Sequence, residues 1–180
     1  MIFDGMHKEE YEKYQKLILA EYFFDPHGIH GVLHTQRVLK HSILLAGMNN
    51  LSSLEKNILY TAVAYHDIGR TCDGIDPAHG LEGWKKAKRL GLIKMQDMSH
   101  TAIMRYVITN HSLDDDCIHK HQDGQCPDTA KLYLQLMKDA DALDRVRIND
   151  LDERYLRNQY SKSLVHFAQE LFYSDNNLRA

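Results

Sequence analysis

The chain has 180 residues, of which 43% are hydrophobic and 26% are charged. This composition is typical of a soluble globular protein and excludes disordered and fibrous chains. The formal net charge of -3 provides no basic field for a phosphate backbone, so we expect no long nucleic acid among the partners. The charged N-terminus does not resemble a signal peptide, and no apolar run is long enough for a membrane span. We therefore expect a cytoplasmic protein without membrane contacts.

Apolar residues recur at steps of three and four along nearly the whole sequence, which predicts an all-α fold. We expect a bundle of about seven or eight helices in a single domain, 1-180, with a core at about 30-148 and flanking helices at 8-24 and 151-173. Asp25-Pro26-His27-Gly28 ends the first helix, and a capping box of Ser52 and Glu55 opens the third. The other expected helices cover 31-48, a segment that begins at Asp76-Pro77, 96-110, a segment that begins near 128, 151-158 and 161-173.

The helix after Ser52 is apolar nearly all round through Tyr65. A helix without a polar face belongs in the middle of a bundle. Its C-terminal end therefore delivers His66 and Asp67 to the interior, with Gly69 as the expected stop. An imidazole and a carboxylate at such a place suit a divalent transition metal.

Asp141 projects from the centre of the apolar face of the helix that begins near 128, whereas Asp139 falls nearly opposite. A buried carboxylate must be neutralised, paired with a cation or bound to metal. The residues leave two alternatives open for Asp141, a salt bridge to Arg145 or Arg147 and a metal ligand. The apolar face that contains Asp141 consists of Ala130, Tyr133, Leu134, Met137 and Ala140.

Three histidines share one face of the helix at 31-48 and the residue before it, namely His30, His34 and His41, together with Arg37. We expect a solvated polar stripe to account for His30 and His41. His34 differs because of the pattern it completes.

The order His34, then His66-Asp67, then Asp141, in the contexts AVAYHDIGR and LMKDADALDRVR, resembles the H...HD...D signature of the HD-domain metal-dependent phosphohydrolases. The resemblance implies a helical bundle in which these four residues bind a divalent metal. His79 and His111 fall where binuclear branches of that family have two extra histidines, which implies two ions with Asp67 between them. Iron or manganese is the metal expected, with magnesium, nickel, cobalt or zinc as alternatives.

Such a centre would cleave a phosphoester or phosphoanhydride by attack of a metal-bound hydroxide. The spacing is similar to that of small stand-alone bacterial HD hydrolases, which implies a nucleotide-like small molecule as substrate. Asp67 and Arg70 are then the expected catalytic residues. Arg70, Lys138 and Arg145 are the expected substrate contacts, and Arg70 replaces a phosphate-contacting lysine of some HD families. A structural salt bridge is the alternative for Arg70.

Other residues near these in the sequence are candidates for supporting roles at the site. Asp144 lies one turn beyond Asp141 and is expected to orient a metal ligand or His34. His30 and Asp73 are the nearby candidates for a general acid. The segment 117-126 contains two cysteines and two histidines without the usual spacing of structural zinc, so we expect a loop over the pocket mouth.

Two other functions stay open at this point. Some HD proteins with the same six ligands are mixed-valent di-iron oxygenases, and the ligand list does not separate them from hydrolases. The other alternative is a non-catalytic nucleotide-binding module.

Overall fold

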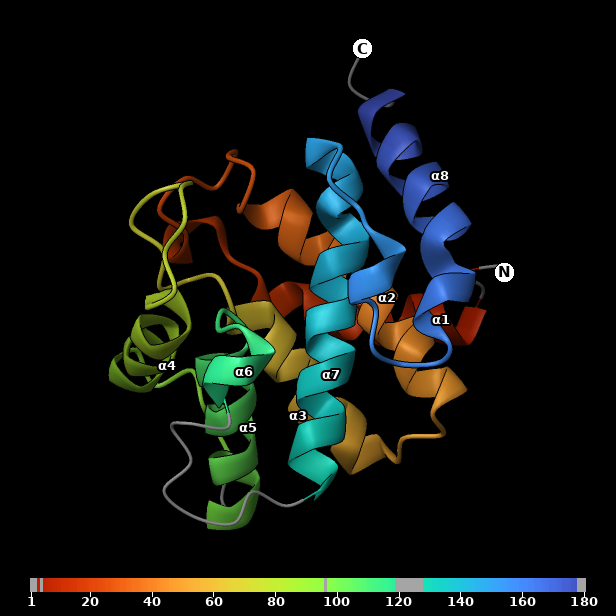
Figure 1. The fold of residues 1–180 in the computed structure, drawn as a ribbon. Helices are drawn as coiled ribbons and strands as arrows, with labels where there is room; N and C mark the ends of the chain where they lie inside the picture. The colour runs from red at the N-terminus through yellow and green to blue at the C-terminus, as the bar shows by residue number, and fades with distance from the viewer. Residues whose placement is uncertain (1–2, 4, 96, 119–127, 178–180) are drawn as a thin grey trace.

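The fold is known from a computed structural model, which describes residues 3, 5–95, 97–118 and 128–177. Within these ranges the chain forms eight α-helices and no strand, which confirms the expected all-α fold (Figure 1). The α-helices are α1 Gly5–Tyr14, α2 Val32–Met48, α3 Ser53–Tyr65, α4 His79–Arg89, α5 Met98–Asn110, α6 Asp115–Ile118, α7 Asp128–Leu143 and α8 Val165–Asn177. Short 3₁₀ segments are η1 Gln15–Leu17, η2 Ala20–Tyr22, η3 Asp144–Ile148, η4 Glu153–Tyr155 and η5 Ser161–Leu164.

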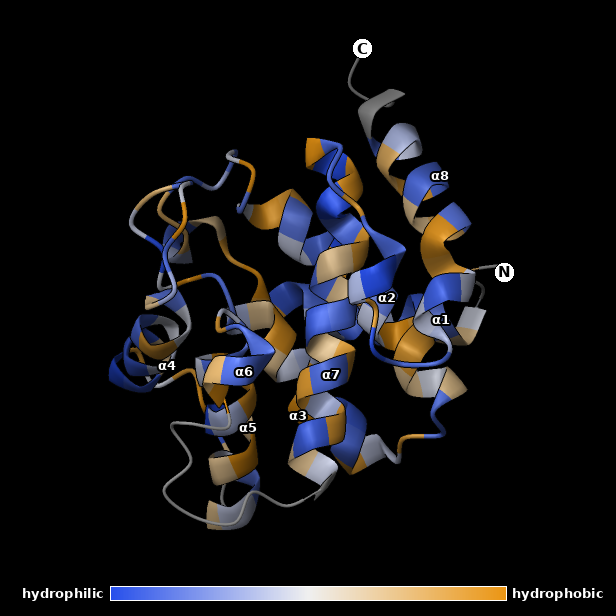
Figure 2. Ribbon diagram, in the orientation of Figure 1, coloured by the Kyte–Doolittle hydropathy of each residue, from blue (hydrophilic) through white to orange (hydrophobic). Residues whose placement is uncertain are grey.

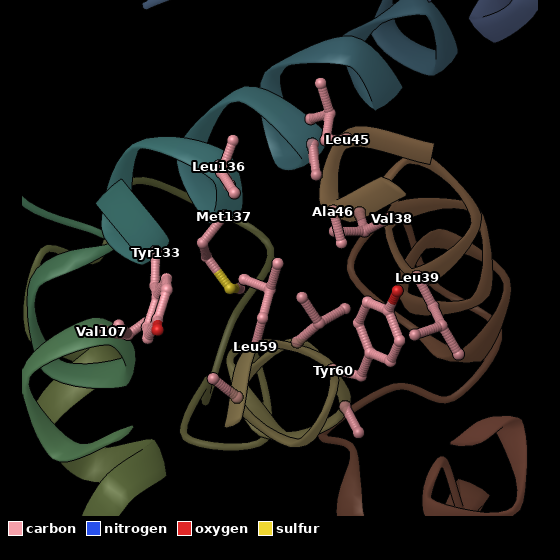
Figure 3. Close-up of a cluster of buried hydrophobic side chains, with 14 of the residues drawn as sticks. Val38, Leu39, Leu45, Ala46, Leu59, Tyr60, Val107, Tyr133, Leu136 and Met137 are labelled. Atoms are coloured by element: carbon pink, nitrogen blue, oxygen red, sulfur yellow. The ribbon is translucent and has the colours of Figure 1, made fainter. Parts of the chain in front are cut away.

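The hydrophobic core lies where α2, α3, α5 and α7 contact one another. Helix α3 is the central element, as its apolar sequence predicts, because most of its residues from Ile58 to Tyr65 are buried. Figure 3 shows side chains from all four helices meeting in this core: Val38 and Leu39 of α2, Leu59 and Tyr60 of α3, Val107 of α5, and Tyr133, Leu136 and Met137 of α7. None of the helices in the described part of the chain is both long and apolar enough to cross a membrane.

The capping box that opens α3 forms as predicted. The Ser52 hydroxyl accepts a hydrogen bond from the Glu55 backbone N–H at 3.4 Å, and a Glu55 carboxylate oxygen accepts from the Ser52 N–H at 2.7 Å. Ser52→Ala is expected to lower the free energy of unfolding by about 1 kcal/mol, because one helix N–H loses its acceptor. Urea denaturation measures the change, and Ser53→Ala, one residue further into the helix, is the matched control. Equal stability of the two variants would contradict this role of the cap.

Several expected helix boundaries are wrong. The first helix ends at Tyr14 rather than near residue 24, and η1 and η2 follow it. Ile18 and Phe23, which follow these two turns, are buried in the core. Helix α4 begins at His79 rather than at Pro77, because the residues before it form a turn in which the His79 N–H donates to the Asp76 carbonyl and the Ala78 N–H to the Asp76 side chain.

The expected helix at 151-158 is also wrong, and its absence is linked to Asp139. Instead of continuing a helix beyond η4, the backbone N–H groups of Arg157 and Asn158 donate to the Asp139 carboxylate at 2.8 and 2.7 Å. The Ser161 hydroxyl donates to the same carboxylate at 2.7 Å, and Asp139 is fully buried. The prediction that only one of the two aspartates of α7 points inward is therefore wrong. Figure 2 shows hydrophilic and hydrophobic residues mixed along the ribbon of α7. The C-terminal segment covers the side that contains Asp139, through the hydrogen bond from Ser161.

Candidate metal centre

The six predicted ligands all come from helix ends, and the structure brings them together at one end of the bundle. His34 lies in the first turn of α2, and His66 is the C-cap of α3, followed directly by Asp67. The remaining three ligands are His79, which is the first residue of α4, His111, which is the C-cap of α5, and Asp141, which lies in the last turn of α7. The four histidines and Asp67 are buried.

The carboxylate of Asp67 lies between two pairs of imidazoles. Its Oδ2 atom is 3.4 Å from Nε2 of His34 and 3.4 Å from Nε2 of His66. Its Oδ1 atom is 3.1 Å from Nε2 of His79 and 3.7 Å from Nε2 of His111. Each carboxylate oxygen therefore faces its own pair of nitrogen atoms.

Asp141 joins the pair on the Oδ2 side. Its Oδ1 atom lies 3.2 Å from Nε2 of His34, but its side chain is 36% exposed, so it stands at the edge of the centre rather than deep inside. Of the two arginines considered as alternative partners, Arg145 pairs with Asp150, and Arg147 binds the carboxylate and carbonyl of Asp144. The contact of Asp141 is thus with an imidazole of the cluster.

Backbone carbonyls fix how three of the imidazoles are turned. Nδ1 of His66 donates to Val63 O and Nδ1 of His111 donates to Ile108 O, both at 2.7 Å, and Nδ1 of His79 contacts the Asp76 carbonyl. A carbonyl oxygen only accepts, so the proton of each neutral ring lies on Nδ1. The Nε2 lone pairs of these rings consequently point into the cluster.

The spacing of these nitrogens fits a bound cation. Two ligand nitrogens that each lie about 2.0–2.1 Å from one ion, at angles between about 90° and 109°, are themselves about 2.9–3.4 Å apart. Nε2 of His79 is 2.9 Å from Nε2 of His111, and Nε2 of His34 is 3.3 Å from Nε2 of His66. Two unprotonated nitrogens, as in the His79–His111 pair, repel at such a distance unless a positive charge lies between them. Three ligand atoms, from His34, His66 and Asp141, lie within 4.8 Å of one another, and so do those of His66, Asp67 and His111.

Asp144 orients His34, which confirms the contact expected from the sequence. Its Oδ2 atom lies 2.7 Å from Nδ1 of His34, on the side of the ring away from the cluster. Arg37 donates to both oxygens of Asp144 at 2.6 and 3.1 Å, and Nη1 of Arg147 lies 3.5 Å from Oδ2. A buried carboxylate with two guanidinium partners is thus held fixed behind one predicted ligand.

The electrostatics of the cluster favour ionised carboxylates. Burial lowers the pKa of His34, and Arg147 lowers it further, but hydrogen bonds to Asp141, Asp144 and Asp67 raise it to about 10. Burial raises the pKa of Asp67, yet the surrounding imidazoles hold it well below its usual value. Burial is the main reason that His66 is neutral, and the neighbouring His111 and His34 add to it, so that its pKa falls to about 3. The carboxylates are therefore charged, and a cation would compete with the proton on His34.

Close contact between α3 and α4 explains the glycine that follows the HD pair. A Cβ atom on Gly69 would lie 2.1 Å from the backbone nitrogen of Gly83 and 2.2 Å from His79 O. The prediction that Gly69 stops the helix is wrong, because α3 already ends at Tyr65. Instead, Gly69 lets the start of α4, and with it His79, approach the end of α3.

The three basic residues expected to contact substrate lie in different surroundings. Arg70 is next to the centre, with Nε 2.9 Å from Oδ1 of Asp67. Lys138 is buried and pairs with Asp115 at 2.6 Å, and Arg145 pairs with Asp150 nearer the surface. The role of all three as substrate contacts stays a prediction.

Two histidines assigned to a solvated stripe make contacts inside the protein instead. His41 is fully buried and contacts Ala140 O through Nδ1 at 3.1 Å, because α2 packs its polar face against α7. His30 is half-buried, and its Nδ1 lies 3.1 Å from Oδ2 of Asp67. The signal for these contacts in the sequence was the spacing of the histidines: His30 lies four residues before His34, and His41 lies seven residues after it. Asp73 lies exposed in the loop before α4, and most of the segment 117-126, from residue 119 onward, falls outside the described residues.

A helical bundle whose helix ends bring four histidines and two aspartates together defines a class of protein able to hold divalent cations in its interior. The sequence profile of the HD domain family matches residues 31–146. The chain belongs to this family, and so to the HD-domain metal-dependent phosphohydrolase superfamily. No curated protein and no solved structure shows a significant match to it. The matched range contains all six predicted ligands.

Proposed function

We propose that this protein is a binuclear phosphohydrolase that cleaves a phosphoester or phosphoanhydride of a nucleotide-like small molecule. The observation that carries the proposal is the division of the Asp67 carboxylate between two pairs of imidazoles, with Oδ1 facing one pair and Oδ2 the other. In this assignment one cation is held by His34, His66, Asp67 and Asp141. The second is held by Asp67, His79 and His111. Iron or manganese suits this set of nitrogen and carboxylate ligands.

Charge balance supports an anionic substrate. The three carboxylates in and behind the centre equal in number the three guanidinium groups that contact two of them, whereas Asp141 faces an imidazole, and the histidine ligands are neutral when they bind metal. Two divalent cations would leave the site positive, lower the pKa of a shared water and neutralise phosphate oxygens. The carboxylates are Asp67, Asp141 and Asp144, and the guanidinium groups are those of Arg37, Arg70 and Arg147.

Phosphate release from purified protein tests the proposal. The protein is stripped with a chelator, reloaded anaerobically with Mn²⁺ or Fe²⁺, and assayed on nucleoside monophosphates, dinucleoside polyphosphates and an activated phosphodiester. We expect hydrolysis that depends on the added metal, detected as inorganic phosphate from the monophosphates, as shorter nucleotides from the dinucleoside polyphosphates and as the released alcohol from the phosphodiester, and no dioxygen consumption. Dioxygen consumption by the Fe²⁺ form without phosphate release would replace the hydrolase with an oxygenase. Binding of nucleotides without turnover would instead indicate a binding module.

His111→Ala tests whether there are two ions. Nε2 of His111 lies 3.7 Å from Oδ1 of Asp67 and 2.9 Å from Nε2 of His79, and its ring lies beside that of His66, so the variant is expected to lose the ion on the Oδ1 side and keep the other. Loss of a residue that only orients a ligand weakens metal binding by about 10- to 100-fold. His111 is itself a proposed ligand, so its loss should weaken binding of the ion on the Oδ1 side by more than that. Metal content after dialysis, measured by mass spectrometry, gives the number of ions. His100→Ala on the same helix is the control, and two ions in both variants would contradict the assignment.

A further inference from the structure

The Asp67 carboxylate has two N–H donors in addition to the four imidazoles that face it. Nε of Arg70 lies 2.9 Å from Oδ1, and Nδ1 of His30 lies 3.1 Å from Oδ2. Arg70 follows Asp67 by three residues, whereas His30 comes from the loop before α2. The two donors thus come from different segments and meet opposite oxygens of one buried group.

The direction of the His30 hydrogen bond follows from its two neighbours. Nδ1 of His30 also lies 3.4 Å from Nη2 of Arg147, which only donates. The contact to Asp67 is shorter, at 3.1 Å, and an ionised carboxylate oxygen only accepts, so a hydrogen bond there requires the proton on Nδ1. The Nδ1 proton therefore points to Asp67 Oδ2.

The loop that contains His30 is held in place on both sides. Nε of Arg147 donates to Ile29 O at 2.7 Å, and the Val32 N–H donates to Pro26 O at 3.0 Å. Gly31 makes this tight path possible, since a Cβ there would lie 2.4 Å from Pro26 O. The imidazole of His30 is consequently fixed against Asp67 by the backbone before and after it.

We propose that His30 and Arg70 are positioning residues that clamp the Asp67 carboxylate and so keep each of its oxygens directed at one cation. The terminal torsion of an aspartate is soft, and a bridging carboxylate that rotates loses one of its two ions. With one N–H donor on each oxygen, the remaining lone pairs stay directed at the two imidazole pairs. This inference rests on the proposed binuclear centre and gives Arg70 a role that does not require contact with substrate.

Substitutions to amide side chains test whether His30 and Arg70 act by donating hydrogen bonds to Asp67. In His30→Asn the amide nitrogen takes about the position of Nδ1, and in Arg70→Gln it takes about the position of Nε, so both keep a donor to Asp67. His30→Ala and Arg70→Ala remove the donor. Calorimetric titration of the chelator-stripped protein with Mn²⁺ measures both binding constants without any substrate. Control variants are His27→Ala in the same loop and Arg154→Ala, both of exposed residues.

Each alanine variant is expected to weaken one of the two Mn²⁺ sites by about 10- to 100-fold, as loss of an orienting hydrogen bond does. In the His111→Ala background, which keeps only the ion on the Oδ2 side, His30→Ala should weaken the remaining site and Arg70→Ala should change it little. The amide variants should bind both ions nearly as the unaltered protein does. Thermal denaturation of the stripped proteins checks that every variant folds.

Three results would overturn the clamp. Unchanged Mn²⁺ binding in both alanine variants would show that the donors do not position Asp67. Binding as weak in the amide variants as in the alanine variants would show that donation is not what matters. Absence of Mn²⁺ binding by the unaltered protein would remove the clamp together with the proposed function. In contrast, two Mn²⁺ sites with the expected pattern, but no phosphate release, would overturn only the proposed reaction.

Discussion

Asp67→Ala is expected to lose both bound ions and to lower phosphate release by about a thousandfold or more. The substitution removes the carboxylate that faces all four histidine Nε2 atoms, at 3.1 to 3.7 Å, so neither half of the centre keeps its full set of ligands. Without the ions, no group of comparable strength lowers the pKa of water or neutralises the phosphate. Metal content by mass spectrometry and a phosphate-release assay on the same preparation measure the two effects together.

The matched control for this variant is Asp116→Ala, which removes an exposed carboxylate of α6 and should change neither quantity. Retention of one ion by Asp67→Ala would show that Asp67 belongs to a single site. Retention of both ions would contradict the bridging assignment altogether.

Asp144→Ala is expected to lower the free energy of unfolding by about 3–5 kcal/mol, because it leaves the buried guanidinium of Arg37 without its main partner and takes one from Arg147. It should also weaken metal binding by about 10- to 100-fold, since His34 loses the acceptor that orients its ring. Urea denaturation in the presence of a chelator isolates the first effect, and Mn²⁺ titration measures the second.

Asp175→Ala is the control, because Asp175 also faces Arg37 but at 3.9 Å and nearer the surface. Such a pair should contribute less than about 1 kcal/mol. If the free energies of unfolding of Asp144→Ala and Asp175→Ala differed by less than about 1 kcal/mol, this would contradict the role of the buried ion pair in holding His34.

The sequence predicted the elements whose signals are local. The capping box of Ser52 and the apolar run up to Tyr65 determine where α3 lies and which residues it places at its buried end. The HD family match confirms the resemblance seen in the order of His34, His66-Asp67 and Asp141. The expected contact between Asp144 and His34 is also confirmed, because one helical turn sets the direction of Asp144 relative to Asp141.

The errors concern residues whose surroundings come from distant parts of the chain. A polar stripe on a helix looks solvated from its sequence, but His41 is buried because α7 packs on that stripe. Helical spacing also gave Asp139 a position away from the core, yet it carries no information about the segment that covers it. The substrate contact of Lys138 is not among these errors and stays a prediction; its side chain pairs with Asp115 of α6.

The hydrogen bonds that Asp139 accepts have a consequence for where this protein can be shortened. The family match ends at residue 146, but Arg157, Asn158 and Ser161 satisfy a carboxylate that lies only two residues before Asp141. A chain trimmed to the matched range would leave that carboxylate without these donors, beside the last turn of α7. The residues beyond the family boundary thus support the helix end that presents Asp141, and we expect a chain shortened to the matched range to be less stable than one that includes them.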